Sequence, residues 1–151
     1  MIETTLVLEG SDRFRAMLKA MGRSALPAIA EALHLEGEAV IADAKDNYVP
    51  TVSTNLKGSG FVKHPMITPT GVVVQLGFGN AAIKYAKRTH ENPRAGKTGG
   101  VSPHGRRYKR WSRVGSWKFL TKPLKRRERG LENRVWRTIL KYWGPLLGGG
   151  R

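Results

Sequence analysis

Apolar residues alternate with polar ones at the start of the chain, and further on they recur at the spacing of a helix. The alternation over residues 1–9 predicts a short strand that Gly10 ends. The face of this strand that we expect to be buried is formed by Ile2, Thr4, Leu6 and Leu8. Capping oxygens on Ser11 and Asp12 then predict the start of a short helix that ends at Gly22.

The clearest pattern in the sequence covers residues 24–48. Apolar or small residues recur there at i, i+3 and i+4 over about six turns, which predicts a long helix. Pro50 marks its end, because proline cannot continue a helix. The expected buried face of this helix is formed by Leu26, Ile29, Ala30, Leu33, Gly37, Val40, Ile41, Ala44 and Tyr48.

Shorter patterns follow in the middle of the chain. Residues 56–63 and 71–78 are rich in strand-forming residues, and the second stretch contains three consecutive valines. We expect the two strands to pair as a hairpin through a connection over residues 64–70, which holds two prolines. Residues 83–92 predict a short element that the pattern does not assign to helix or strand.

The end of the chain predicts a last helix over residues 123–143, weakened locally by Gly130. A length of 151 residues fits one domain with a substantial core. We therefore predict a single domain over residues 1–145, and a flexible glycine-rich tail over residues 146–151.

The charge of the chain is strongly asymmetric. Residues 1–50 hold five Lys/Arg and eight Asp/Glu, a net charge of −3, whereas residues 51–151 hold twenty-two and three, a net charge of +19. A positive field of this size implies nucleic acid, an anionic membrane or an acidic protein as a neighbour. Nucleic acid is the favoured class of partner.

Several classes of protein are excluded or disfavoured by composition. The chain has no cysteine, which excludes a disulfide framework, a thiolate metal site and a thiol nucleophile. No apolar run approaches the roughly 20 residues that a transmembrane helix needs, so we predict no membrane association. The first residues lack the basic and then apolar layout of a secretory signal, which predicts synthesis and folding in a cytoplasm.

The most strongly charged segment is Pro93–Gly115, called the basic loop below. It holds seven Lys/Arg, five glycines, two prolines and no acidic residue, so we predict an exposed loop that contacts a polyanion. Residues 108–111, Tyr-Lys-Arg-Trp, combine aromatic and basic side chains that could stack on bases and bind phosphates. Alternatively, the tryptophan could pack onto the domain or onto a neighbouring subunit. Candidates for contact with nucleic acid or a channel are Arg94, Lys97, Arg106, Arg107, Lys109 and Arg110.

Two glycine motifs suggest nucleotide binding on their spacing alone. Residues 77–82 match the dinucleotide fingerprint, but residues 97–103 contain no acid to hold a ribose, which favours a strand end that needs glycine. Residues 96–98 resemble the end of a phosphate-binding loop, but the position of its first glycine is Glu91, which would repel phosphate. We predict no cofactor.

The four histidines are His34, His64, His90 and His104, and none has the close spacing of metal ligands. We predict no metal site. Adjacent His90 and Glu91 could form a catalytic pair, although such a pair more often orders a loop through hydrogen bonds. No nucleophile elbow accompanies them. We predict no catalytic residue and no enzymatic activity.

Two motifs flank the basic loop. Residues 85–92 read Tyr-Ala-Lys-Arg-Thr-His-Glu-Asn, and residues 117–124 read Trp-Lys-Phe-Leu-Thr-Lys-Pro-Leu. Together they resemble the paired motifs of the head-tail joining and tail-completion (neck) proteins of long-tailed bacteriophages. Further matches upstream strengthen the resemblance, which covers about residues 24–140. Within them, Asn55 replaces the glycine that is usual in the family. These upstream residues are Ala44, Lys45, Val49, Pro50, Thr54, Leu56 and Ser59.

The resemblance implies an α+β fold in which a small antiparallel sheet packs against a long helix, with a C-terminal helix after the loop. It implies a structural role without enzymatic activity or cofactor, in a ring that is expected to be a hexamer at the virion neck. The implied partners are the head-closure or adaptor ring, the tail tube proteins and the backbone of double-stranded DNA. Candidate residues for the subunit interface or the fold motif are Tyr85, His90, Glu91, Asn92, Phe119 and Leu120.

A ring would also account for the positive charge of the basic loop. Heterologous contacts turn the same face of every subunit towards one axis. A basic loop repeated in this way would form a positive collar around DNA of any sequence. The competing hypothesis is a monomeric, sequence-independent nucleic-acid-binding module.

Overall fold

The structure is a computed structural model that describes residues 1–8, 12–22, 25–50, 54–69, 71–93, 95 and 115–147. In chain order its elements are β1 (Ile2–Leu8), α1 (Asp12–Met21), α2 (Ala25–Asn47), α3 (Thr54–Gly58), β2 (Gly60–Val62), β3 (Met66–Thr68), β4 (Gly71–Phe78), α4 (Ala86–Glu91), α5 (Thr121–Glu128) and α6 (Leu131–Leu147). None of the described helices is long and apolar enough to cross a membrane.

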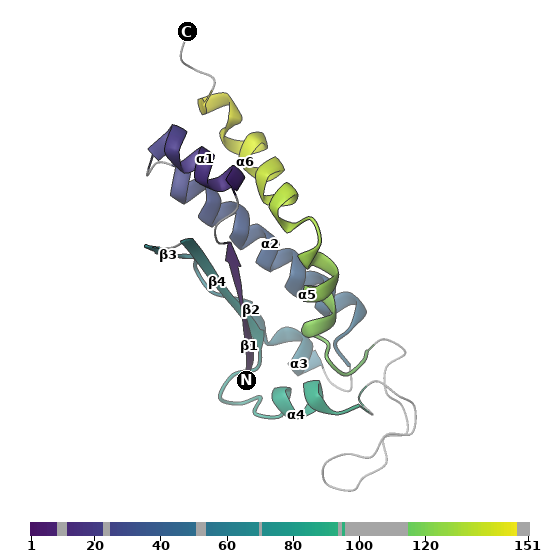
Figure 1. Cartoon of the computed structure of the whole chain (residues 1–151). Coiled ribbons are helices and arrows are strands. Elements are labelled where there is room, and N and C mark those ends of the chain that lie inside the picture. Colours follow the sequence, from purple (N-terminus) through teal and green to yellow (C-terminus); the bar gives the residue numbers. More distant parts are fainter. Residues whose placement is uncertain are drawn as a thin grey trace, which may run out of the picture.

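Strand β4 is the centre of a small antiparallel sheet (Figure 1). β1 pairs with it over all seven residues of β1, from Ile2 opposite Phe78 to Leu8 opposite Val72. β2 and β3 pair with the other edge of β4, β2 with residues 76–78 and β3 with residues 71–73. This arrangement confirms the predicted α+β fold with a small antiparallel sheet.

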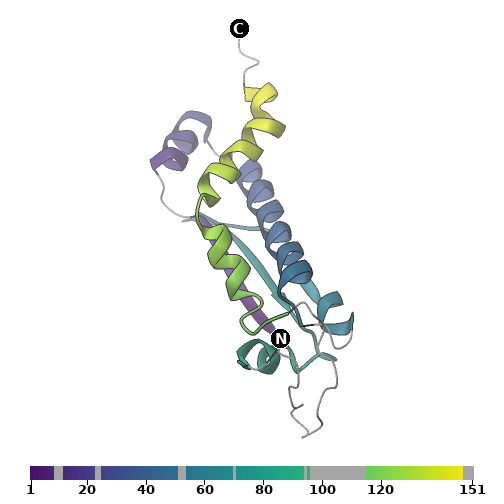
Figure 2. The same ribbon diagram turned by 90° about the vertical axis from the view of Figure 1, so that its right-hand side faces the viewer.

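One face of the sheet is covered by helices. Along β4, Val72, Val74, Leu76 and Phe78 are buried against α2, as the alternation of its residues requires. Gly37 lets α2 approach the sheet closely, because a Cβ there would lie 3.1 Å from Cγ1 of Val62. Helices α5 and α6 pack beside α2, and α5 lies on the side of β1 (Figure 2).

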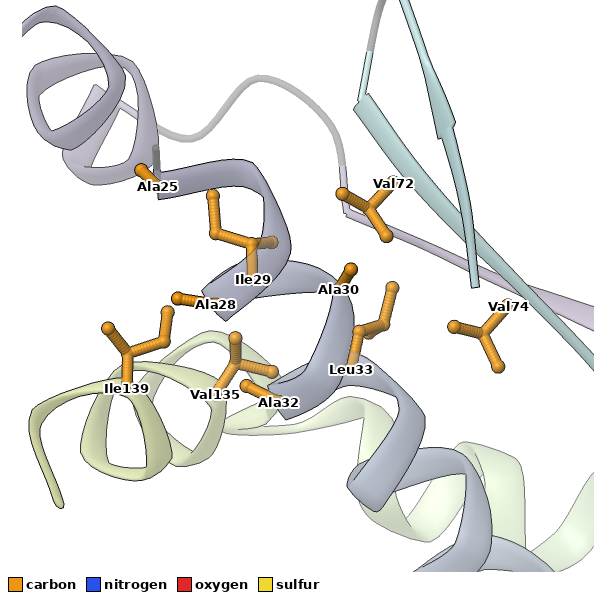
Figure 3. Packing of buried hydrophobic residues seen from close by; sticks show 10 residues of the cluster. All are labelled: Ala25, Ala28, Ile29, Ala30, Ala32, Leu33, Val72, Val74, Val135 and Ile139. Atoms are coloured by element: carbon orange, nitrogen blue, oxygen red, sulfur yellow. The ribbon is translucent and has the colours of Figure 1, made fainter. Parts of the chain in front are cut away.

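The core has two halves along α2. The first joins α2, β4 and α6, and Figure 3 shows its buried residues, among them Ile29, Leu33 and Ile139. The second joins the other half of α2 to the end of β4 and to the segment before α5. Its largest fully buried residues are Phe78, Phe119, Leu76 and Leu120.

The prediction of one strand over residues 56–63 is wrong in its first half. Leu56 lies in the short helix α3, and the N–H of Ser59 donates to the C=O of Asn55 at 3.0 Å. The predicted connection over residues 64–70 contains strand β3, which forms the tighter hairpin with β4. Helix α4 accounts for the element left unassigned over residues 83–92.

The predicted helix over residues 123–143 consists of two helices. α5 ends at Glu128, and Gly130 has φ +73°, a left-handed conformation that glycine adopts without steric cost. α6 then runs to Leu147, two residues into the segment predicted as a tail, and residues 148–151 lie outside the described residues.

The glycine motif over residues 77–82 lies at the end of an antiparallel strand. The dinucleotide fingerprint needs a parallel crossover, and all three neighbours of β4 are antiparallel. Gly77 is required by packing, because a Cβ there would lie 2.2 Å from the C=O oxygen of Ile2. Gly79 has φ +98° and turns the chain out of the sheet. The interpretation of the motif as a strand end that needs glycine is confirmed.

Candidate interface at the base of the basic loop

Helix α4 leads into the basic loop and lies near the first residues of β1 (Figure 1). Ala86 and His90, four positions apart, are buried and fix one face of the helix to the domain. The helix ends at Asn92, where ψ is 110° and the N–H donates to the C=O of Thr89 at 3.3 Å. The exposed face of α4 therefore points away from the core.

His90 connects the two motifs that flank the loop. Its side chain is 3% exposed, its Nδ1 lies 2.8 Å from Oε1 of Glu91, and its Nε2 lies 3.2 Å from Oγ1 of Thr121. A carboxylate only accepts, so Nδ1–H donates to Glu91 and the neutral ring accepts the Thr121 hydroxyl proton at Nε2. The backbone C=O of His90 also accepts the N–H of Lys118 at 2.7 Å. The hydrogen bonds with Thr121 and Lys118 cross from one motif to the other.

Aromatic packing continues the connection into the core. The rings of His90 and Phe119 meet edge to face with centroids 5.0 Å apart, and Phe119 meets Phe78 in the same way at 5.4 Å. Phe119 and Leu120 are fully buried in the second half of the core. We call His90, Glu91, Lys118, Phe119 and Thr121 the motif clasp.

Charge is balanced on the exposed side of the motif clasp. Nζ of Lys118 forms an ion pair and hydrogen bond with Oε2 of Glu91. The hydrogen bond from Lys118, followed by that from His90, lowers the pKa of Glu91, while burial lowers the pKa of His90. At neutral pH the motif clasp therefore combines a neutral imidazole with an ionised carboxylate and an ammonium group. The hydrogen bonds of His90 to Glu91 and Thr121 join α4 to the segment after the loop, as the loop-ordering interpretation of the His90–Glu91 pair requires.

The other end of the loop is held by the backbone after α2. The N–H of Ser116 donates to the C=O of Tyr48 at 2.8 Å, and Nζ of Lys122 donates to Oγ of Ser116 at 2.9 Å. Gly115, with φ +140°, packs so closely that a Cβ there would lie 2.5 Å from Cα of Pro50. At the N-terminal end of the loop, Ala95 is buried, with 2% exposure. Both ends of the loop are therefore fixed to the domain.

The structure separates the six candidates for interface or fold motif. His90, Phe119 and Leu120 are buried and act within the fold, and Glu91 completes the motif clasp at the surface. Asn92 ends α4, and its C=O accepts the N–H of Ala95 at 2.9 Å. Tyr85, at 41% exposure, presents the most open aromatic surface of the six. The six candidates for nucleic acid or channel contact, Arg94, Lys97, Arg106, Arg107, Lys109 and Arg110, lie outside the described residues.

Three exposed cations on α4 and the turn before it, called the α4 cations below, were missed by the reasoning from sequence. Lys84, Lys87 and Arg88 are spaced i, i+3 and i+4, on the side opposite buried Ala86 and His90. No ion pair joins any of the three to another described residue. The sequence could have indicated this exposed face only if residues 83–92 had been recognised as helical, because Ala86 and His90 then mark the opposite, buried face.

Three arginines of the last two helices pair with buried acids of α2. Arg127 and Arg134 both contact buried Glu36 of α2, at 3.3 Å and 3.0 Å. Arg126 contacts buried Asp43 at 2.6 Å. All three arginines are therefore paired with buried acids, although the side chain of Arg126 is 57% exposed, and they add less to an external positive field than their number indicates.

Within the ranges given for the structure, no three His, Asp or Glu side chains are grouped so that they could hold a metal ion. Comparison of the chain with protein-family models, with curated proteins and with solved structures gave no match. The residues themselves and the resemblance of the two motifs are what indicate a function.

Proposed function

We propose that the protein is a structural component of a bacteriophage neck, a ring-forming tail-completion or tail-terminator protein that joins the tail to the head-closure complex around the DNA channel. The observation that carries the proposal is the motif clasp. The two segments that resemble the neck family are separated by the basic loop, yet His90, Glu91, Phe119 and Thr121 bring them into one packed unit. The loop is thus an insertion between two parts of one structural motif.

The charges of the loop base support contact with a polyanion. Lys87 and Arg88 on α4 and Lys84 in the turn before it face solvent, and Glu91 on α4 already has Lys118 as its partner. Repeated around a ring, this face would place several weak phosphate contacts side by side, and such contacts act together. Contacts to the DNA backbone do not depend on sequence, as the proposed channel requires.

The oligomeric state and the location test the proposal directly. Light scattering of the purified chain over a range of concentrations should give a closed oligomer many times heavier than the 16.7 kDa monomer, and electron microscopy should show rings of six subunits. Antibody labelling of virions should then locate the chain between head and tail. A monomer at every concentration that never joins rings or tails would contradict the neck function.

The channel contact needs its own experiment. Reversing the charges of Arg106, Arg107 and Arg110 should weaken salt-dependent DNA binding and genome retention while assembly continues. If none of these properties changes, the basic loop does not contact DNA.

The exposed α4 cations also favour the competing function, a monomeric module that binds nucleic acid without sequence preference. That function predicts a monomer whose affinity for duplexes of unrelated sequence is equal and falls steeply with salt. A neck protein differs from it by assembling in the absence of nucleic acid.

A further inference from the structure

The outer edge of β1 has no strand partner within the described residues. The N–H of Lys63 donates to the C=O of Gln75 at 2.7 Å, so the odd-numbered residues of β4 direct their backbone groups to β2 and β3. The even-numbered ones therefore bond to β1, and the N–H and C=O groups of Glu3, Thr5 and Val7 point to the free edge. No backbone hydrogen bond recorded among the described residues uses these groups.

A groove lies next to this edge. Its cavity has a volume of about 290 Å³ and lies between Thr5 and Leu6 of β1 on one side and Leu124 and Leu131 of α5 and α6 on the other, with Val40 of α2 in its lining. The helices thus extend past the last strand of the sheet, and their apolar side chains border the position that a further strand would occupy. Figure 2 shows α5 alongside β1.

β1 lacks the features that normally protect an exposed edge. Edge strands are usually very short, interrupted by proline or a bulge, or lined with lysine. β1 pairs without interruption over seven residues, contains no proline, and has Glu3 as its single charged side chain. An open edge of this kind is suited to accepting a strand, because an added strand satisfies the free backbone groups.

We propose that strand β3 of a second copy of this chain adds to the free edge of β1, so that neighbouring subunits share a continuous sheet. The inference rests on the proposed ring and names the contact that would build it. Each subunit offers β1 at one edge of its sheet and β3 at the other, so the contact is heterologous and can repeat from subunit to subunit until a ring closes.

The exposure of β3 supports its role as the added strand. Met66 and Ile67 are each 50% exposed, although they are large apolar residues in a strand. Burial of the exposed half of such a side chain stabilises a contact. Ile67 pairs with buried Val72 and so is on the α2 face of the sheet, where the apolar residues that border the groove, Leu6, Leu124 and Leu131, offer matching surface.

Charge supports a second copy as the partner. A chain with net charge +16 repels its copies, so a contact between them needs segments without like charges. Residues 65–83, which include β3, contain no Asp, Glu, Lys or Arg. Residues 1–12, which include β1, contain three acidic residues and no Lys or Arg. The two edges can therefore meet without repulsion between cations.

A pair of proline variants of the full chain tests the contact. Thr5→Pro removes an N–H that points to the free edge and leaves the hydrogen bonds to β4 in place. We expect Thr5→Pro to keep the wild-type circular dichroism spectrum but to shift the mass by light scattering from the oligomer to the monomer. Thr4→Pro is the matched control, because it removes an N–H directed at β4 and should lower folding stability instead.

Cross-linking tests the identity of the partner strand without removing the contact. The chain has no cysteine, so Thr5→Cys and Met66→Cys introduce single thiols, both on the sheet face opposite α2. We expect a disulfide-linked dimer when the two variants are mixed, and Glu3→Cys and Val7→Cys cover the neighbouring registers. Lys19→Cys on exposed α1, mixed with Met66→Cys, is the control and should cross-link several-fold less.

The outcomes separate this inference from the neck function. If wild-type rings form and Thr5→Pro also forms them, or if no β1–β3 pair cross-links, the strand addition is wrong and the ring function stands. If the cross-link forms in open chains of subunits, the strand addition stands and the ring function is wrong. A monomeric wild-type chain contradicts both.

Discussion

Two groups of cations follow and precede the basic loop in the sequence, one on α5 and α6 and the other on α4 and the turn before it. In the first group Arg126, Arg127 and Arg134 contact the buried carboxylates of Asp43 and Glu36. In the second group Lys84, Lys87 and Arg88 face solvent, and no ion pair to another described residue involves them.

The difference shows that a cluster of basic residues in a sequence does not indicate how much charge is available to a partner. Glu36, the acid that binds both Arg127 and Arg134, lies 91 and 98 residues upstream of them on a different helix. A buried carboxylate holds its arginines because leaving either group unpaired away from water is costly. The α4 cations have no such constraint, so their charge remains free to contact a polyanion.

The largest effect is expected when the first group loses its buried partner. Glu36→Ala leaves Arg127 and Arg134 without a carboxylate, and we expect the free energy of unfolding to fall by about 3 kcal/mol, the lower end for a buried pair, because both arginines are partly exposed. Urea unfolding followed by circular dichroism measures the change. Glu31→Ala, at an exposed position of the same helix, is the control and should stay within about 0.5 kcal/mol. Equal stability of the two variants would contradict an internal role for these arginines.

A smaller effect, on binding and not on folding, is expected when the second group is neutralised. With Lys84, Lys87 and Arg88 all changed to Gln, we expect the affinity for a random-sequence duplex at 0.1 M salt to fall about tenfold or more. The slope of log affinity against log salt should decrease by about 2 to 3, because each phosphate contact contributes roughly 0.9. Fluorescence anisotropy over a salt series measures both quantities.

The matched comparison for that variant is Arg127→Gln. Loss of this internally bound cation should reduce stability and change DNA affinity much less than the α4 triple variant does. The distinction between the two groups fails if Arg127→Gln weakens DNA binding as strongly as the triple variant.

The smallest effect is expected from pH at the motif clasp. Burial lowers the pKa of His90 below its ordinary value of 6.5, so the unfolded chain takes up this proton first as the pH falls. Stability should therefore decrease from pH 7 towards pH 5, by at most about 1.4 kcal/mol per pH unit for one proton. The pKa of Glu91 is lowered from 4.5, so its contribution is lost only at still lower pH.

His90→Gln should flatten this part of the stability profile relative to wild type. Denaturant unfolding at pH 7, 6 and 5 gives the profile, with His64→Gln, at an exposed position, as the control. An unchanged slope in His90→Gln would mean that another group titrates in this range.

Periodicity predicted the elements that local sequence determines. The long helix α2 and strands β1 and β4 carry continuous patterns, and the structure confirms them. Strand β3 was missed because its three residues lie between Pro65 and Pro69, too few for a pattern. It is a strand because Thr68 closes the turn through two side-chain contacts with Gly71, which aligns it with β4.

The candidate site was predicted in part. The resemblance to the neck family identified both motifs, but it did not distinguish buried Phe119 and Leu120 from exposed Tyr85. The burial of Phe119 and Leu120 depends on packing with β4 and α2, which the motifs alone do not specify. The left-handed backbone of Lys118, with φ 58°, was also unforeseen, since a lysine rarely adopts it. Its position between His90 and Glu91 depends on residues 27 or more positions away.

Fixing of the chain at Ala95 and Gly115 has a consequence for evolution and for engineering. The cost of closing a loop grows only slowly with its length, by about 0.6 kcal/mol for each doubling, provided that its ends stay in place. Here hydrogen bonds and close packing of the domain hold those ends. The segment between them can therefore accept longer, shorter or unrelated sequences while the fold persists, which makes it a suitable graft site for an affinity tag or a foreign epitope.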